Sequence, residues 1–227
     1  MSKGIFVTGT GTDVGKTYVT ALIVKKLKDA GLKAGYYKAA LSGAKLCNGK
    51  LIPGDAEYVK KIAGLDISLD KTVSFVYKNA VSPHFAAKLE NKQVDMDIIK
   101  KDYKALSNVY DYLTVEGSGG IICPLRYDNE KIIMLEDVIK ELNLSVLIVA
   151  STGLGTINAT VLTVEYLRSK NIKIEGIILN EFHKGDMMEE DNLYMIEKLT
   201  DVKVIGVVEN KQKEVDISVN MLTYLYK

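Results

Sequence analysis

Several residues and patterns that place a protein in a special class are scarce in this sequence. Its 227 residues include no tryptophan, two cysteines and three prolines, and 30 lysines and arginines nearly balance 29 aspartates and glutamates. The net charge of +1 gives no electrostatic reason to expect nucleic acid or a charged membrane surface as a partner. Cys47 and Cys123 lie far apart, and neither belongs to a C-x-x-C pair. We therefore expect a reducing compartment and neither a disulfide framework nor a zinc site.

Long apolar runs are missing as well. Before Thr8, the N-terminal segment has only three consecutive apolar residues, whereas a secretory signal needs about 7–15. The apolar run 146–150 falls well short of the ~18 residues of a membrane span. Because 47% of the residues are hydrophobic and 26% are charged, the composition is that of an ordinary folded protein. These properties predict a soluble, cytoplasmic protein that has no membrane partner.

Apolar, β-rich runs alternate with helical patterns along the chain, and several runs are continuously apolar, as in parallel strands covered on both faces. The pattern predicts strands over 5–8, 34–38, 112–116, 145–150, 175–180 and 202–208, and helices over 17–30, 135–142, 156–169, 186–199 and 219–226. Repetition of strand, helix and strand indicates an α/β fold with a doubly wound, mostly parallel sheet flanked by helices. Since no linker or repeat interrupts the chain, we expect a single domain over residues 1–227.

The region 47–108 is less regular and is interpreted as an excursion that covers the sheet. Asp55 follows Pro53-Gly54 and opens one predicted helix. Asp97 is expected to cap a second helix that continues through Leu106.

A phosphate-binding loop follows the first predicted strand, with the sequence Gly-Thr-Gly-Thr-Asp-Val-Gly-Lys-Thr at 9–17. Glycines let successive backbone N–H groups point inward, and the N-terminus of the next helix adds partial positive charge. Lys16 is expected to reach the outer phosphates of a nucleotide, and the Thr17 hydroxyl to bind Mg²⁺. The spacing departs from the standard loop, because Thr10 stands where its first glycine is expected.

Four further polar segments, within 36–43, 115–120, 151–158 and 179–180, fall at the ends of predicted strands. Ligands bind at the carboxyl ends of strands in an open parallel sheet, so these segments should converge on the phosphate-binding loop. Glu116 ends an apolar strand and needs a buried partner, for which Mg²⁺ is a natural choice. Asp55 has two readings of similar weight, a helix cap or a metal ligand. Lys38 alone is more typical of a surface lysine.

Taken together, these residues resemble the dethiobiotin synthetase family of P-loop NTPase-like enzymes, which close the ureido ring in biotin synthesis. The likeness covers the loop 9–17, Tyr-Lys at 37–38, Ser-Gly at 42–43, Ser-Pro-His at 82–84, Val-Glu-Gly-Ser-Gly-Gly at 115–120, Pro-Leu at 124–125, Gly-Thr-Ile-Asn at 155–158 and Asn180. Three segments depart from the family pattern. Asp13 replaces a glutamate, Ala39-Ala40 replaces Pro-Val, and no proline follows Gly206.

The resemblance implies a role for each matching position. It implies catalytic roles for Lys38, Lys16 and Thr12, and Mg²⁺ binding by Thr17, Asp55 and Glu116. It implies nucleotide contacts from Asp13, Val14, Gly15, Lys16, Thr17, Asp55, Glu116, Gly117, Ser118, Gly119, Asn180 and Glu181. It implies substrate contacts from Ser42, Thr12, Gly155, Thr156, Ile157 and Asn158.

The reaction that the resemblance implies joins 7,8-diaminononanoate, CO2 or bicarbonate, and ATP. A carbamate of one amine attacks the γ-phosphate to give a carbamic-phosphoric anhydride, and the second amine closes the ring and expels phosphate. The resemblance also implies a homodimer with shared sites, in which the helix N-terminus near Gly155 holds the carboxylate of substrate bound to the other subunit. Phosphoryl transfer needs alignment and positive charge rather than a protein nucleophile, and two lysines, a metal ion and a helix N-terminus supply them.

Other readings lie within the same fold group. A partitioning or septum-site switch ATPase usually has Lys-Gly-Gly early in the loop, where this chain has Thr10-Gly11-Thr12. A cobyrinate-amidating ligase needs a glutaminase domain for which this chain has no room. An idle nucleotide-binding subunit would lack Lys38 or Glu116, and both are present.

Overall fold

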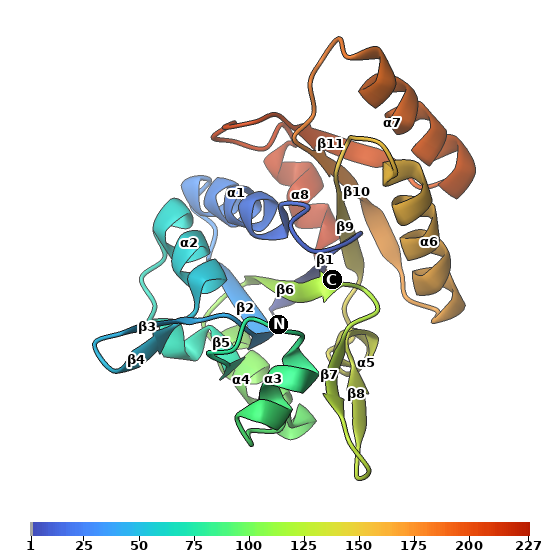
Figure 1. Cartoon of the computed structure of the whole chain (residues 1–227). Coiled ribbons are helices and arrows are strands. Elements are labelled where there is room, and N and C mark those ends of the chain that lie inside the picture. The colour runs from blue at the N-terminus through green and yellow to red at the C-terminus, as the bar shows by residue number, and fades with distance from the viewer. Residues whose placement is uncertain (1) are drawn as a thin grey trace.

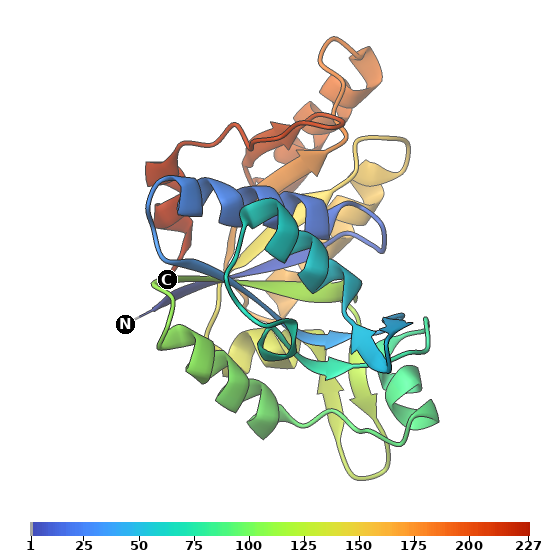
Figure 2. The same ribbon diagram turned by 90° about the vertical axis from the view of Figure 1, so that its left-hand side faces the viewer.

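Seven strands form one sheet in the order β11-β10-β9-β1-β6-β2-β5 (Figures 1 and 2). The computed structural model describes residues 2–227. The strands of the sheet are β1 (Lys3–Gly9), β2 (Ala34–Leu41), β5 (Val73–Val76), β6 (Tyr112–Gly120), β9 (Val146–Ala150), β10 (Ile174–Asn180) and β11 (Val204–Val208). All neighbouring pairs in this sheet are parallel. The strand order reverses at β1, which is the arrangement that opens a ligand crevice at the carboxyl ends of the strands.

Helices cover both faces of the sheet. One face packs against α1 (Lys16–Asp29), α2 (Gly54–Ala63) and α8 (Val219–Leu225), and the other against α4 (Met96–Ser107), α5 (Leu135–Glu141), α6 (Thr156–Ser169) and α7 (Met187–Thr200). Side chains alternate between the two layers: Ile5 and Val7 join the α1 side, and Phe6 joins the other. Both layers are apolar, which explains the continuous apolar runs in the sequence.

Smaller elements lie on the side towards which the strand arrows point in Figure 2. They are α3 (Pro83–Leu89) and two antiparallel hairpins, β3 (Lys45–Cys47) with β4 (Lys50–Ile52), and β7 (Pro124–Tyr127) with β8 (Ile132–Met134). A short 3-10 turn, η1 (Leu69–Lys71), precedes β5. None of the helices in residues 2–227 has the length and apolar character needed to cross a bilayer.

The six predicted strands and the predicted helices are present, and the α/β fold is confirmed. The region 47–108 does more than cover the sheet, because it contributes β5 to the edge beside β2. The prediction that Asp97 caps its helix is wrong: Asp95 precedes the helix, and its carboxylate accepts the Asp97 backbone N–H at 2.8 Å. Strands β2 and β6 also continue past Lys38 and Glu116, because Ala40 and Leu41 pair with β5 and Gly120 pairs with Gly9 of β1.

Candidate active site

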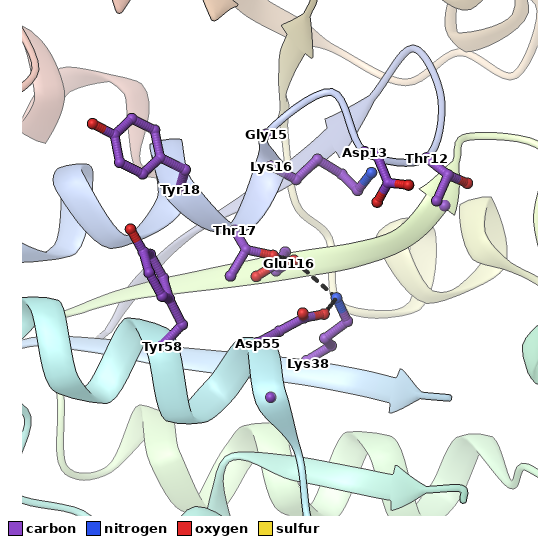
Figure 3. A pocket seen from close by; sticks show the side chains of 12 residues that line it. Thr12, Asp13, Gly15, Lys16, Thr17, Tyr18, Lys38, Asp55, Tyr58 and Glu116 are labelled. Atoms are coloured by element: carbon purple, nitrogen blue, oxygen red, sulfur yellow. Dashed lines mark hydrogen bonds and ion pairs between the residues drawn. The ribbon is translucent and has the colours of Figure 1, made fainter. Parts of the chain in front are cut away.

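A cavity of about 520 Å³ lies where the phosphate-binding loop, β2, β6 and α2 meet (Figure 3). The loop lines one wall, and Lys38, Asp55 and Glu116 line the opposite wall. The parallel sheet places these segments together, because β1, β6 and β2 are adjacent and all end at the same edge. The expected convergence of the loop with the ends of two further strands is therefore observed.

The phosphate-binding loop holds its lysine inside the cavity. Lys16 is 7% exposed, and its ammonium donates to the Gly11 carbonyl at 2.7 Å. Burial and the nearby Lys38 ammonium lower the pKa of Lys16. Because α1 begins at Lys16, the free N–H groups of its first turn point at the same space. The loop can therefore receive a strongly anionic group.

Lys38 lies between two carboxylates, as the dashed lines in Figure 3 show. Its ammonium is 2.5 Å from Asp55 Oδ2 and 2.8 Å from Glu116 Oε1. Burial alone would lower the pKa of Lys38, but the two carboxylates and their hydrogen bonds raise it above its usual value. The side chains of Lys38 and Glu116 are 4% and 0% exposed, whereas that of Asp55 is 39% exposed. Lys38 is thus a buried cation facing the loop and not a surface lysine.

The donor set around Glu116 suits Mg²⁺. The Thr17 hydroxyl donates to Glu116 Oε1 at 2.7 Å, and the Lys38 ammonium donates to both Glu116 and Asp55, so one hydroxyl and two carboxylates lie close together. Mg²⁺ prefers oxygen ligands and is commonly held by one or two carboxylates together with substrate phosphates. Within residues 2–227, no three His, Cys, Asp or Glu side chains form a metal-binding group by themselves. The oxygen donors of Thr17, Asp55 and Glu116 fit Mg²⁺ bound together with the phosphates of a nucleotide.

Three tyrosines at or near the cavity were not predicted from the sequence to belong to the site. Tyr36 donates its hydroxyl to Glu116 Oε2 at 2.9 Å. Tyr18 and Tyr58 line the cavity with ring centroids 6.5 Å apart, and the Tyr18 hydroxyl donates to the Gln212 carbonyl. Tyr36 precedes Lys38 by two residues, so the two share a face of the strand. That spacing is a signal the sequence did contain.

Asn180 lies beside the loop at the end of β10. It is 4% exposed, and its amide nitrogen donates to the Val14 carbonyl at 3.2 Å. Its oxygen Oδ1 is buried and has no hydrogen-bond partner. Glu181, the next residue, is exposed and has a φ of 62°. A buried acceptor without a partner is unusual in a folded protein and points to a ligand.

Gly15→Ala is expected to weaken nucleotide binding by about 10-fold or more. Gly15 has a φ of +89°, and an added Cβ would lie 2.0 Å from Asn180 Nδ2, so both the loop and Asn180 must move. Isothermal titration with ATP measures the effect. Gly49→Ala is the matched control, because Gly49 has a φ of +76° but nothing within 4 Å of the added atom. Equal losses in the two variants would mean that the contact with Asn180 has no role.

His183→Gln is expected to destabilise the protein in acid more than in base. His183 Nδ1 lies 2.9 Å from Glu189 Oε1, and this hydrogen bond raises the pKa of His183 above 6.5. A raised folded-state pKa stabilises the protein fully below the unfolded value, and this stabilisation is lost as pH rises through the folded value. Unfolding free energies of both proteins at about pH 5.5 and about pH 8.5 test the sign. A difference that is independent of pH would contradict it.

The remaining predicted site residues fall into three places. Thr12, Asp13 and Gly119 line the cavity. Gly117 is buried against Phe6, the Ser118 hydroxyl donates to the Ala40 carbonyl at 2.6 Å, and Ser42 follows β2. Gly155, Thr156, Ile157 and Asn158 form the start of α6, where the Thr156 hydroxyl donates to the Ser151 carbonyl at 2.6 Å. This last group is not part of the cavity lining.

Comparison with known proteins gives the family. A family model described as "AAA domain" matches residues 3–216. An ATP-dependent dethiobiotin synthetase BioD from Brachyspira hyodysenteriae is 55% identical over 208 residues, which is 92% of each chain. The chain belongs to the dethiobiotin synthetase family. A further dethiobiotin synthetase, from Clostridium botulinum, is 47% identical and covers 100% of this chain and 99% of its own. The resemblance seen in the motifs is thereby confirmed.

Solved structures with the same fold are more distant in sequence than these dethiobiotin synthetases. The MinC:MinD cell division protein complex of Aquifex aeolicus matches with a TM-score of 0.58 and 18% identity, over 98% of this chain and 86% of that chain. A ParA family ATPase from Chlorobium tepidum matches with a TM-score of 0.57 and 12% identity, over 92% of this chain and 84% of that chain. Such identities show the fold alone. They do not favour the alternative prediction of a switch ATPase.

Proposed function

We propose that this chain catalyses the ATP-dependent conversion of 7,8-diaminononanoate and CO2 to dethiobiotin. The observation that carries the proposal is the buried Lys38 ammonium, which lies between Asp55 and Glu116 and faces the phosphate-binding loop. A second lysine, Lys16, is in the same cavity. Two preorganised cations around a phosphate site are what transfer of a γ-phosphoryl group requires.

ATP is the nucleotide that the site fits. Asp13–Thr17 would surround its phosphates, and Asn180 would lie at its base. The free Asn180 Oδ1 would accept a hydrogen bond from the 6-amino group of adenine. Guanine presents an oxygen at that position, so it would leave the buried acceptor unpaired and bind less well.

The Thr17 hydroxyl and the carboxylates of Asp55 and Glu116 would hold Mg²⁺. When bound, this ion would neutralise charge on the phosphates of ATP. The same carboxylates hold Lys38 in the structure. Binding of MgATP would therefore weaken the hold of Asp55 and Glu116 on Lys38 and leave its charge available to the γ-phosphate.

One amine of the substrate first adds to CO2 and loses a proton, which forms a carbamate, and two further steps follow. A carbamate oxygen of the substrate attacks the γ-phosphorus and ADP leaves, which forms a carbamic-phosphoric anhydride. The second amine then attacks the carbamoyl carbon, expels phosphate and loses a proton. Lys16 and Lys38 would stabilise the charge on the transferred group, and Thr12 and Ser42 would contact the substrate. No protein nucleophile is required.

A homodimer would complete the site. The α6 start at 155–158 lies outside the cavity lining, yet its free N–H groups suit the substrate carboxylate at the far end of its alkyl chain. Apolar side chains near it are exposed: Leu154 by 97% and Leu162 by 62%. A second subunit that packed against this end of α6 would cover these leucines. We therefore propose that α6 of one subunit binds substrate that reacts in the other.

Mixing two inactive variants tests the shared site. Lys38→Ala removes the catalytic lysine, and Asn158→Glu places a negative charge at the start of α6 without disturbing Gly155, whose φ is +92°. In a random two-fold mixture, a shared site would restore about a quarter of wild-type sites, because one of the two sites in each heterodimer has neither defect. No recovery after verified subunit exchange would mean that each site is built from one chain.

The assay of the proposed function supplies purified protein with diaminononanoate, bicarbonate, Mg²⁺ and a panel of nucleotides. Dethiobiotin and phosphate are both followed. We expect equal amounts of the two products, and ATP to be preferred over GTP. Phosphate release without dethiobiotin would contradict the proposal and favour a switch ATPase.

A further inference from the structure

The two oxygens of Glu116 have different partners. Oε1 accepts the Thr17 hydroxyl at 2.7 Å and the Lys38 ammonium at 2.8 Å, both of which belong to the cavity. Among residues 2–227, the Tyr36 hydroxyl is the one donor to Oε2, at 2.9 Å. The Glu116 side chain is 0% exposed, so bulk solvent supplies no donor to Oε2. Both carboxylate oxygens are thus held by hydrogen bonds, and Oε1 is the one turned towards the phosphate-binding loop.

The strand pairing explains this arrangement. Lys38 of β2 is the register partner of Glu116, and Tyr36 pairs with Thr114 two residues earlier on β6. Tyr36 and Lys38 lie on the same face of β2 because strand side chains alternate. One strand therefore supplies a neutral donor to one oxygen and a cation to the other. Tyr36 itself is 1% exposed and lies in the core between the sheet and α1.

We infer that Tyr36 is a positioning residue for metal-dependent nucleotide binding, and that its hydroxyl fixes the rotation of the Glu116 carboxylate so that Oε1 faces the incoming cation. The terminal torsion of a glutamate is broad, so an unheld carboxylate would sample orientations that do not suit a metal ion. A neutral donor fixes the group without cancelling its charge. The inference rests on the proposed role of Glu116 as a metal ligand.

The Tyr36 hydroxyl has a closely matched control in Tyr226. The hydroxyl of Tyr226 is hydrogen-bonded to Thr114 Oγ1 at 2.6 Å, and the residue is 2% exposed. Tyr226 thus contacts the same strand as Tyr36 but does not reach Glu116. Replacing either tyrosine by phenylalanine keeps the ring and removes a buried hydroxyl. Only Tyr36→Phe releases the carboxylate.

The test measures how strongly the metal ion assists nucleotide binding. Isothermal titration gives the dissociation constant of β,γ-methylene-ATP with Mg²⁺ and with EDTA, and the ratio of the two constants is the metal coupling. The proteins are wild type, Tyr36→Phe, Tyr226→Phe, Glu116→Gln and the double variant Tyr36→Phe/Glu116→Gln. Thermal unfolding reports whether each variant is folded. The dissociation constant of the ATP analogue in EDTA reports whether its phosphate-binding loop is intact.

We expect Tyr36→Phe to lower the metal coupling by about 10- to 100-fold, which is the usual effect of removing a group that orients a metal ligand. The dissociation constant of Tyr36→Phe in EDTA should match that of wild type. Both dissociation constants of Tyr226→Phe should match wild type as well. In the Glu116→Gln background, Tyr36→Phe should have no further effect on the metal coupling, because Tyr36 acts through the Glu116 carboxylate. A purely structural role of Tyr36 would lower the coupling whether or not Glu116 is present.

Three results would overturn the inference. The first is wild-type metal coupling in Tyr36→Phe. The second is that Tyr36→Phe lowers the coupling as much in the Glu116→Gln background as in wild type. The third is wild-type coupling in Glu116→Gln, which would mean that Glu116 has no role in metal binding. The proposed function is judged separately, by dethiobiotin formation in the wild-type protein. A wild type that makes no dethiobiotin but shows the expected coupling pattern would contradict the proposed function and leave the inference in place.

Discussion

Lys38→Ala is expected to lower turnover by about 10²-fold or more and to change ATP affinity little. The ammonium is buried beside the phosphate-binding loop, so once bound MgATP has weakened its pairs with Asp55 and Glu116, it is already in place for the charge that develops on the transferred phosphoryl group. An interaction that strengthens in the transition state affects kcat, whereas one made equally in the ground state affects binding. Steady-state kinetics at saturating MgATP, with ATP affinity from isothermal titration, separates the two.

The control for Lys38→Ala is Lys45→Ala, which removes an exposed lysine of β3 near the same end of the sheet. Removing Lys38 also leaves the buried Glu116 carboxylate without its cation, so a lower melting temperature is expected in the absence of MgATP. Assays are therefore made with MgATP present. Near-normal turnover in Lys38→Ala would show that the catalytic assignment is wrong.

Lys16→Ala is expected to impair both binding and turnover. Lys16 is 7% exposed, and within residues 2–227 the only hydrogen bond of its ammonium is to the Gly11 carbonyl, so the other N–H groups of the ammonium can pair with phosphate oxygens. A hydrogen bond to a charged group is worth about 1.5–3 kcal/mol, which corresponds to a rise of about 10- to 100-fold in the dissociation constant of ATP. Turnover should fall by about 10²-fold as well, because the same charge acts in the transition state.

Titration of ATP and kinetics at saturating ATP measure the two effects of Lys16→Ala. Lys25→Ala is the control, since Lys25 lies on the same helix but pairs with Asp29 at the surface. A variant that binds ATP normally yet is inactive would place Lys16 in the chemical step alone. A variant with normal turnover at saturating ATP would remove it from that step.

Local motifs made the phosphate-binding loop predictable. Lys16 and Thr17 belong to the nine-residue motif 9–17, which begins at the end of a strand and runs into the start of a helix. Residues close in the sequence therefore define their surroundings. Glu116 was singled out for a similar reason, as a carboxylate at the end of an apolar run. Their proposed contacts with ATP and Mg²⁺ stay predictions.

Long-range pairing was beyond the sequence. Lys38 meets Glu116 from 78 residues away, and this contact exists because β6 inserts between β1 and β2. The spacing of Tyr36 and Lys38 places both on one face of a strand, but only the register of β2 with β6 shows that this face meets Glu116. Strand β5 has four residues and lies at the sheet edge, which leaves too short a pattern to detect. Asp95 and Asp97 are equally good capping residues until the first helical residue, Met96, is known.

The most direct test of the central claim follows oxygen from bicarbonate into phosphate. If a carbamate oxygen accepts the γ-phosphoryl group, ring closure must expel phosphate that carries this oxygen. The protein is given fully ¹⁸O-labelled bicarbonate, diaminononanoate, MgATP and unlabelled water, and the products are analysed by mass spectrometry before the label exchanges with water. The account predicts one ¹⁸O atom in each phosphate and one in each dethiobiotin. Dethiobiotin formed together with unlabelled phosphate would contradict it.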